Sequence, residues 1–184
     1  MTNETSEHAA QISQLQSKIR TIPDFPTEGI LFRDITPVLA DPATFAIAVD
    51  LHLHRIRDLI GDIDANVGME ARGFWFGPIL AHRLGIGFVP ARKPGKLPAA
   101  TIAEDYALEY ASNTLQLHAD ALREGARVLI VDDLLATGGT AAATTNLIER
   151  LGGKVLAQLF MIELVGLGGR ARQGDVRVEA LLQF

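Results

Sequence analysis

The spacing of hydrophobic residues along the chain predicts helices that alternate with strands. Ile12, Leu15 and Ile19 recur at helical spacing, which predicts an amphipathic helix over residues 8–20. Apolar runs predict strands at 86–91, 126–131 and 154–164, and shorter strands are expected at 64–69 and 176–183. Further helices are expected over 42–60, 72–84 and 139–151. This alternation indicates an α/β fold in which helices flank a mainly parallel central sheet.

Two regions interrupt this alternation. Prolines and glycines within residues 23–29 mark a loop after the first helix. Residues 93–106 lack periodicity and are rich in proline, glycine and lysine, which predicts a mobile loop. Residues 106–118 form two short alternating runs around Ser112-Asn113, and this pattern fits a two-stranded excursion from the core.

The composition is that of a globular protein with one core. The 184 residues are 48% hydrophobic and 21% charged, which excludes a disordered chain. No repeat or linker divides them, so we expect a single domain over residues 1–184, with an N-terminal hood over about 1–37 and a flexible loop over about 93–118. No apolar run approaches the ~20 residues that span a bilayer, so no membrane partner is expected.

Targeting signals and charge narrow the class of protein further. The first residues, MTNETSEHAAQ, lack the basic and apolar regions of a signal peptide, and there is no cysteine, so we expect a cytoplasmic protein without disulfides. The net charge is −5, from 17 Lys+Arg against 22 Asp+Glu, whereas nucleic-acid binding proteins are commonly basic. We therefore expect no nucleic-acid partner. Arg92, Lys93 and Lys96 do form a local cationic cluster, which by itself fits a solvated loop.

The segment from Val128 to Gly153 carries the most informative pattern. An apolar strand runs to Val131, and two carboxylates, Asp132 and Asp133, follow at its carboxyl end. A loop of small residues then opens a helix and consists of Ala136, Thr137, Gly138, Gly139 and Thr140. Ligands bind at the carboxyl ends of strands in open α/β sheets, and a glycine-rich helix start presents N–H groups to a phosphate. An ordinary turn explains the glycines alone, whereas the ordered combination with paired acids favours a ligand site.

The same segment narrows the ligand to a sugar phosphate. The loop has neither the lysine of the Walker A pattern nor the G-x-G-x-x-G fingerprint of dinucleotide sites. Carboxylates accept hydrogen bonds from sugar hydroxyls and can orient a magnesium shell through water. A carboxylate pair beside a phosphate-binding loop therefore suits a ribose 5-phosphate, with its hydroxyls on Asp132 and Asp133 and its phosphate on residues 136–140.

VLIVDDLLATGGT, at residues 128–140, resembles the phosphoribosyl pyrophosphate (PRPP) motif of the type I phosphoribosyltransferases. The resemblance to their adenine-specific branch extends over almost the whole chain. It includes DFPTEGILFRDITP at 24–37, EARGFWFGP at 70–78, ARKPGKLP at 91–98 and YALEY at 106–110. The resemblance implies a purine-salvage pentosyltransferase, commonly a homodimer, that converts adenine and PRPP into AMP and pyrophosphate with Mg²⁺.

The resemblance also implies a role for each matching residue around PRPP. Asp132 and Asp133 are expected to contact the ribose hydroxyls, and residues 136–140 to hold the 5-phosphate. Arg72 occupies the pyrophosphate-contacting position, where its planar fork suits bidentate binding of phosphate oxygens. The further cations expected beside the pyrophosphate are Arg92, Lys93 and Lys96. Mg²⁺ is expected on pyrophosphate, ribose hydroxyls and water, with few direct protein ligands.

The resemblance places the base on the N-terminal segment and favours adenine. Leu31, Phe32 and Arg33 are expected to form the adenine pocket, because an apolar and aromatic run can stack on a purine while backbone groups bind its edge. In the branch that uses 6-oxopurines, an aspartate facing the purine N7 stands at the position of Ala136. Alanine here is the residue of the adenine branch.

The acid and base chemistry is expected on the flexible loop. Glu109 resembles the family's candidate for handling the N7 proton, and a carboxylate on a closing loop can act as a general acid or base. Tyr110 is expected to close over the reaction centre. The loop over 93–110 would also exclude the water that otherwise hydrolyses PRPP.

Three alternatives are open at this point. The first is a phosphoribosyltransferase for another base, which a panel of bases would distinguish. The second is a PRPP-sensing regulator that binds nucleic acid without catalysis, against which the acidic charge and the retained Arg72 and Glu109 argue. The third is a nucleotide-binding module of unknown purpose, which fits residues 128–140 only.

Overall fold

The computed structural model describes residues 2–107 and 112–184 of the chain. The chain divides into two compact units, Met1–His54 and Arg55–Phe184. The expectation of one domain over residues 1–184, with its hood and flexible loop, stays a prediction. No helix in the described part of the chain is both long enough and apolar enough to cross a membrane.

The first unit joins helices to a small antiparallel hairpin. Its elements are α1 (Thr2–Lys18), β1 (Arg20–Pro23), β2 (Leu31–Asp34), α2 (Thr36–Ala40) and α3 (Pro42–Arg55). The loop expected over 23–29 is therefore the turn of a hairpin. The hairpin is locked across its open end, where the Nε of Arg20 donates to a carboxylate oxygen of Asp34 at 2.9 Å. The expected helix over 42–60 ends at Arg55, earlier than its apolar pattern predicts.

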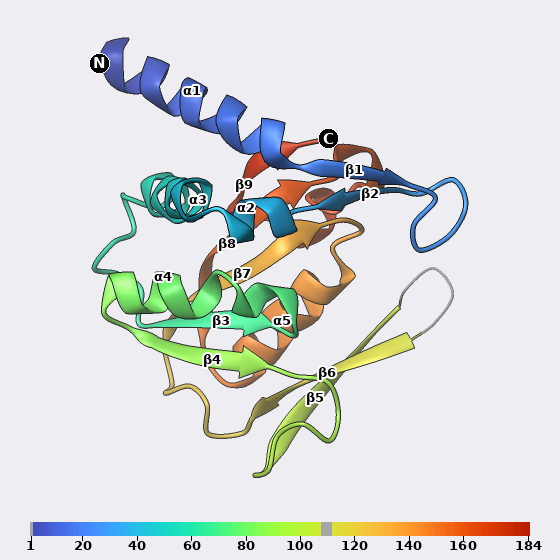
Figure 1. The fold of residues 1–184 in the computed structure, drawn as a ribbon. Coiled ribbons are helices and arrows are strands. Elements are labelled where there is room, and N and C mark those ends of the chain that lie inside the picture. The colour runs from blue at the N-terminus through green and yellow to red at the C-terminus, as the bar shows by residue number, and fades with distance from the viewer. Residues whose placement is uncertain (1, 108–111) are drawn as a thin grey trace. The chain divides into compact units, whose positions relative to one another are not determined.

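The second unit is built on a five-stranded parallel sheet in the order β4-β3-β7-β8-β9 (Figure 1). Its strands are β3 (Ala65–Met69), β4 (Gly87–Ala91), β7 (Arg127–Leu135), β8 (Lys154–Glu163) and β9 (Val178–Gln183). Each begins within two residues of its predicted start, and the apolar runs of β7 and β8 are typical of strands buried on both faces. This confirms the α/β fold with a parallel central sheet.

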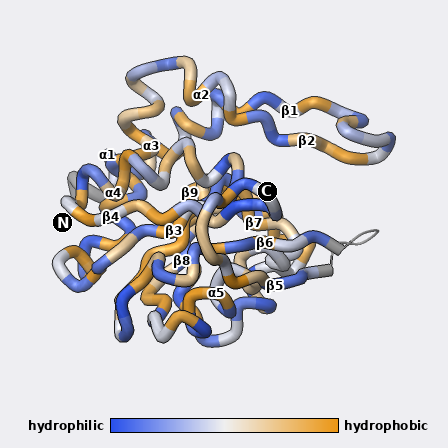
Figure 2. Tube along the Cα trace, turned by 90° about the horizontal axis from the view of Figure 1, so that it is seen from below, coloured by the Kyte–Doolittle hydropathy of each residue, from blue (hydrophilic) through white to orange (hydrophobic). Residues whose placement is uncertain are grey.

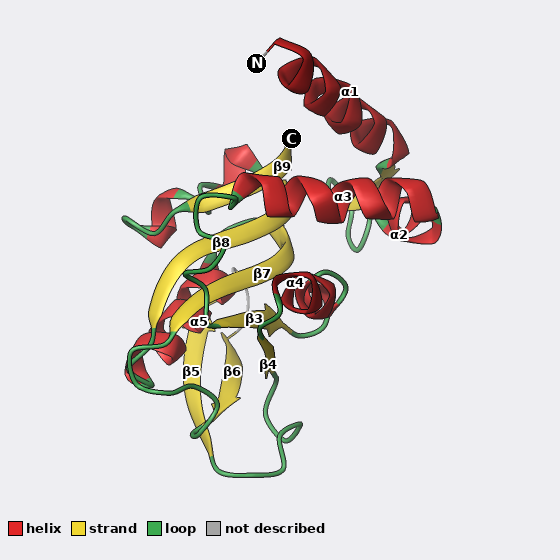
Figure 3. Ribbon diagram, turned by 90° about the vertical axis from the view of Figure 1, so that its left-hand side faces the viewer, coloured by secondary structure: helices red, strands yellow, loops and turns green. Residues whose placement is uncertain are grey.

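Helices cover both faces of this sheet. Figure 3 shows α4 (Gly77–Leu84) on one face and α5 (Gly139–Arg150) on the other. Three short 3₁₀ turns are η1 (Arg72–Phe74), η2 (Val165–Leu167) and η3 (Ala171–Gln173). The expected helix over 72–84 is thus divided into η1 and α4. Val67, Ile130 and Phe160 lie in the core between the layers, and Figure 2 traces hydrophobic residues along the central strands.

A two-stranded arm projects from the second unit beside α5. It consists of β5 (Thr101–Ala107) and β6 (Ser112–His118), paired antiparallel from Thr101↔His118 to Ala107↔Ser112. The excursion is confirmed, but its position is corrected. Its first strand occupies residues predicted as a mobile loop, and Ser112-Asn113 begins the second strand instead of forming the turn. Leu115 and Leu117 are buried and anchor the arm in the core.

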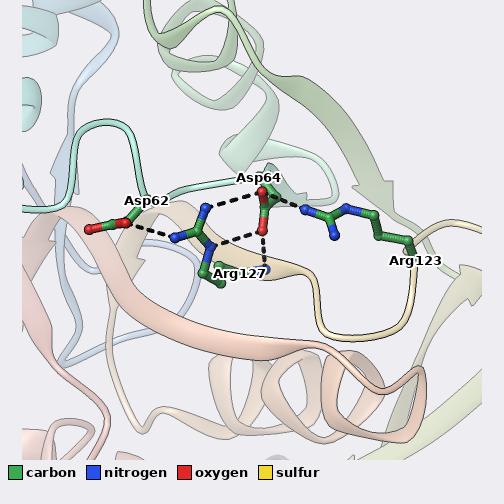
Figure 4. Close-up of polar contacts among 4 residues, drawn as sticks. All are labelled: Asp62, Asp64, Arg123 and Arg127. Atoms are coloured by element: carbon green, nitrogen blue, oxygen red, sulfur yellow. Dashed lines mark hydrogen bonds and ion pairs between the residues drawn. The ribbon is translucent and has the colours of Figure 1, made fainter.

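Charged residues join the amino ends of two central strands (Figure 4). Asp64, just before β3, accepts hydrogen bonds from the backbone N–H of Arg127 at 2.8 Å and from its Nε at 3.1 Å. Arg123 donates to the same carboxylate at 2.7 Å, and Arg127 also reaches Asp62 at 2.7 Å. The cluster connects β3 with β7 at the edge of the sheet where both strands begin.

Candidate active site

The order of strands places a crevice between β3 and β7. From β3 the chain proceeds outward to β4, whereas from β7 it proceeds in the opposite direction to β8 and β9. Such a reversal separates the connections at the carboxyl ends of the two strands, where ligands of open α/β sheets bind. Met69 ends β3 and Leu135 ends β7, so the residues around these two positions are the candidates for a site.

The turn after β3 packs tightly against β7. A Cβ atom on Gly73 would lie 2.5 Å from the carbonyl oxygen of Val131, so only glycine permits this approach. The peptide bond between Glu70 and Ala71 in this turn is cis. The close packing directs Arg72 toward β7, and its Nε lies 3.2 Å from the Oδ2 of Asp133.

The paired acids lie inside β7, not after it. The strand continues to Leu135, which corrects the expectation that it ends at Val131, because β8 pairs with residues as far as 135. The Oδ1 of Asp132 accepts a hydrogen bond from the backbone N–H of Asp133 at 2.9 Å. The Oδ1 of Asp133 is buried and has no hydrogen-bond donor among the residues that the structure describes.

Burial sets the protonation of these acids. It raises the pKa of Asp132 well above the usual range, and the nearby charge of Asp133 raises it further. Burial also raises the pKa of Asp133, although the charge of Arg72 opposes the increase. Part of Asp132 still reaches a cavity, so the carboxyl is enclosed by protein but accessible to a ligand.

The small-residue loop forms the floor of this cavity. Gly138 caps α5 with a φ of 76°, in the left-handed region that favours glycine. The first N–H groups of a helix have no partner within it, so they are available to an anion. The cavity measures about 160 Å³. It is lined by Met69, Arg72, Asp132, Leu134, Leu135, Ala136, Thr137, Gly138, Gly139, Thr140, Ala141 and Phe160.

The cations after β4 lie outside that lining. Arg92 donates to Glu70 at 2.9 Å, and the backbone N–H of Lys93 donates to the same oxygen at 2.9 Å. Burial alone would raise the pKa of Glu70, but these hydrogen bonds outweigh it and hold that pKa below its usual range. The side chains of Lys93 and Lys96 are exposed. Glu70 thus joins the turn after β3 to the end of β4.

The residues expected to bind the base belong to the first unit, on β2. Leu31 is 55% exposed, an unusual position for a leucine, and Phe32 packs edge-on against Phe25 with ring centroids 5.0 Å apart. Arg33 donates to the hydroxyl of Thr21 across the hairpin. The remaining expected residues, Glu109 and Tyr110, lie outside the described part of the chain.

Sequence reasoning missed several residues around the cavity. Met69, Leu134, Leu135, Ala141 and Phe160 line it alongside the predicted residues. Met69 and Phe160 come from apolar strands, in which nothing distinguishes a lining residue from a core residue. Glu70 could have been found, because a lone acid directly after a buried strand and two residues before Arg72 is a positional signal.

Comparisons of the sequence with known proteins identify a family and close relatives. Residues 35–175 match the family model of the phosphoribosyl transferase domain. The chain is 55% identical to the adenine phosphoribosyltransferase of Dinoroseobacter shibae, over 92% of this chain and 95% of that protein. It is 54% identical to the enzyme of Erwinia tasmaniensis, over 94% and 93%.

Solved structures of the same class share the fold. The crystal structure of adenine phosphoribosyltransferase from Rhodothermus marinus has a TM-score of 0.90 at 50% identity and covers 96% of this chain and 99% of that chain. The enzyme from Saccharomyces cerevisiae, crystallised with an imino-altritol bisphosphate and adenine, has a TM-score of 0.90 at 40% identity over 95% and 99%.

Proposed function

The chain belongs to the adenine phosphoribosyltransferase family, and on this premise we propose that the cavity between β3 and α5 is where it acts in purine salvage. The reaction transfers a 5-phosphoribosyl group from PRPP to adenine and yields AMP and pyrophosphate. The observation that carries the assignment is the acid pair of β7, with Asp133 buried and Asp132 lining the cavity, directly beside the glycine-capped start of α5.

The loop at residues 136–140 holds the 5-phosphate. Its support is the left-handed cap at Gly138 and the hydroxyls of Thr137 and Thr140 in the cavity lining. Pockets for drug-sized ligands measure roughly 300 Å³ or more. A cavity of about 160 Å³ therefore suits a phosphoryl group with part of a sugar.

Asp132 and Asp133 bind the ribose hydroxyls. Sugar hydroxyls donate to carboxylates, and the Oδ1 of Asp133 is a buried acceptor without a donor. A buried polar atom of this kind costs stability unless a ligand or a water molecule satisfies it.

The pyrophosphate lies beside Arg72, with Arg92, Lys93 and Lys96 as further cations. Arg72 reaches the cavity and its position is supported by the contact with Asp133. Negative charge grows on pyrophosphate as it leaves, so a guanidinium held there stabilises the transition state more than the ground state.

The donor set fits a magnesium ion carried mainly by the substrate. Within residues 2–107 and 112–184, no three His, Cys, Asp or Glu side chains gather where they could hold a metal. Asp132 and Asp133 offer carboxylate oxygens, which suit Mg²⁺ through water and the ribose hydroxyls. When bound, Mg²⁺ neutralises charge on the pyrophosphate.

Adenine stacks on the β2 segment of Leu31, Phe32 and Arg33, and Glu109 and Tyr110 act at the base. N9 of adenine attacks C1′ of the ribose, the C1′–O bond to pyrophosphate breaks, and the proton on N7 passes to the Glu109 carboxylate. The support for these assignments is the match of LFRD and YALEY to the family. Leu31 adds an exposed apolar side chain suited to a purine face.

The proposal extends to the assembly and its place in the cell. On the family resemblance we infer a homodimer in the cytoplasm, built from chains each with one phosphoribosyltransferase domain over residues 1–184. Light scattering of the purified protein tests the dimer, which predicts a mass twice the 19.8 kDa of one chain.

A panel of bases tests the function. The purified protein is mixed with PRPP, Mg²⁺ and one of adenine, hypoxanthine or guanine, and nucleotide and pyrophosphate are followed. We expect AMP and pyrophosphate in equal amounts from adenine, with little product from the two 6-oxopurines. Binding of PRPP without turnover of any base would contradict the proposal and favour a regulator instead.

A further inference from the structure

A buried glutamine lies behind the phosphate loop, outside every motif described so far. The segment at residues 164–177 connects β8 to β9 and contains η2 and η3. Gln173 ends η3 and is only 7% exposed. Its amide group donates to the carbonyl oxygen of Gly138 at 3.1 Å and to that of Gly169 at 2.8 Å.

The carbonyl that Gln173 holds is the one that starts α5. The same Gly138 oxygen accepts the N–H of Ala142 at 3.0 Å, which is the first hydrogen bond of the helix. A glycine with a φ of 76° has no side chain to restrict its peptide, so external contacts must fix the direction of that peptide. Outside α5 itself, Gln173 is the side chain that hydrogen-bonds this carbonyl in the described part of the chain.

The orientation of the Gln173 amide is itself fixed from β8. Gln158, which is fully buried, donates to the side-chain oxygen of Gln173 at 3.1 Å and to the hydroxyl of Thr145 on α5 at 3.0 Å. The Gln173 oxygen thus faces β8, and its NH₂ group faces the two carbonyls. The side-chain amides of Gln158 and Gln173 thus connect β8 to the peptide of Gly138.

Close backbone packing holds the segment against the loop. A Cβ atom on Gly169 would lie 2.2 Å from the carbonyl oxygen of Ala136, and one on Gly138 would lie 2.5 Å from the carbonyl oxygen of Gly169. Arg170 fastens the segment to the sheet, because it reaches both carboxylate oxygens of Glu163, at 2.9 and 2.6 Å, and the carbonyl of Val178.

We propose that Gln173 is a positioning residue for PRPP, which acts by holding the Gly138 peptide so that the donors at the start of α5 stay directed at the 5-phosphate. The inference rests on the proposed role of residues 136–140. It predicts that changes at Gln173 weaken PRPP binding, although the side chain does not line the cavity.

The substitution Gln173→Glu tests this inference with almost no change in shape. It replaces an NH₂ group that donates to two carbonyl oxygens with a carboxyl group, which repels both when ionised and donates to only one of them when neutral. We expect the KM for PRPP to rise about tenfold, with kcat at saturating PRPP and the KM for adenine within about twofold of wild type. PRPP should also raise the Tm of the variant less than it raises the Tm of the wild type.

The matched control is Asn66→Asp. Asn66 is fully buried on β3 and donates its amide to a backbone carbonyl, that of Gly77, at 3.2 Å. The same chemical change thus occurs at another buried amide, but its carbonyl acceptor is at the start of α4 and away from the phosphate loop. We expect Asn66→Asp to lower the Tm and leave the KM for PRPP within about twofold. Gln173→Met, which removes the donors without adding charge, replaces Gln173→Glu if that variant does not fold.

A loop variant, Thr137→Asp, separates this inference from the proposed function, because a carboxylate in the cavity lining repels a phosphate held by the loop. If Thr137→Asp leaves the KM for PRPP unchanged, the phosphate role of the loop fails and the positioning role fails with it. If Thr137→Asp raises that KM while Gln173→Glu and Gln173→Met behave like Asn66→Asp, only the positioning role is overturned. A selective increase in the KM for PRPP in both Gln173 variants supports it.

Discussion

At the scale of single residues, two adjacent acids differ in their surroundings. Neighbouring side chains of a strand point to opposite faces, so Asp132 and Asp133 cannot share one environment. Asp132 lines the cavity, whereas Asp133 is buried beside Arg72. Asp132 is therefore the acid directly accessible to a ligand, and Asp133 also orients the guanidinium of Arg72.

The variant Asp133→Asn tests this difference. It keeps the size of the side chain and removes the charge that faces Arg72 at 3.2 Å. We expect kcat/KM for PRPP to fall roughly ten- to a hundredfold, since a hydrogen bond to a charged group is worth about 1.5–3 kcal/mol. Initial rates at varied PRPP measure the effect. Asp175→Asn, at an exposed position, is the control, and equal rates in the two variants would contradict the role of Asp133.

The pH dependence of the reaction follows from the raised pKa of Asp132. The carboxylate form of Asp132 binds ribose hydroxyls. Burial and the charge of Asp133 raise the pKa of Asp132 above the ordinary value of about 4, so this side chain becomes neutral at a higher pH than an exposed aspartate does. We expect kcat/KM for PRPP to decrease as the pH falls through that raised pKa. Removing the charge of Asp133 lowers the pKa of Asp132, so the acid limb of the profile should shift to lower pH in Asp133→Asn. A limb at the same pH in both proteins would show that Asp132 does not cause it.

At the scale of elements, α5 joins the phosphate loop to the β5–β6 arm. The helix begins at the loop, and near its end Asn146 and Arg150 each donate to Glu104 of β5 at 2.9 Å. Arg150 also donates to the carbonyl of Ala103 at 2.6 Å. One helix thus holds both the phosphate loop and the base of the arm that leads to residues 108–111.

Removing this attachment should loosen the arm. In Arg150→Met the aliphatic stem remains, but the ion pair and the backbone hydrogen bond are lost. We expect amides of residues 102–106 to exchange hydrogen several-fold faster, because local opening becomes easier. Hydrogen exchange followed by mass spectrometry measures this. Arg172→Met, at an exposed arginine of η3, serves as the control, and unchanged exchange in Arg150→Met would refute the attachment.

Elements with a strong local pattern could be predicted, and those held by distant partners could not. The strand at Val128 and the helix at Gly139 follow from a continuous apolar run and a glycine-rich start, and the cavity was expected between them. By contrast, β5 is held in place by its pairing with β6 and by Arg150. Its own residues show little periodicity, so the sequence pattern does not predict this strand. Gln173 and Gly138 lie 35 positions apart in the sequence, so no local pattern predicts their contact.

At the scale of the whole molecule, we expect the charged cluster at the amino ends of β3 and β7 to contribute to stability, because it lies away from the cavity. Hydrogen bonds from Arg127, helped by the charge of Arg123, hold the pKa of Asp64 well below its usual range. A lowered pKa of Asp64 in the folded state stabilises the protein fully above the unfolded pKa of about 4. This stabilisation declines as the pH falls below that value and is lost as the pH falls through the lower, folded pKa.

The variant Asp64→Asn isolates this contribution. We expect a lower Tm than wild type at pH 7 and a Tm that changes less between pH 5 and the acid end of the range. Melting curves across pH measure both effects. Because the cluster lies at the opposite edge of the sheet from the cavity, the KM for PRPP at pH 7 should stay within about twofold of wild type. A Tm difference independent of pH would contradict the assignment to Asp64.

The pairing of β3 with β7 also governs when the site can form during synthesis. Ala65 and Val128 are paired although 63 positions separate them (128 − 65). Contacts between residues so far apart in sequence form slowly, because a long loop must close first. Phe160 on β8 also lines the cavity, and Gln173 contacts its loop. We therefore expect a nascent chain to bind PRPP only after residues as far as Phe160 have left the ribosome.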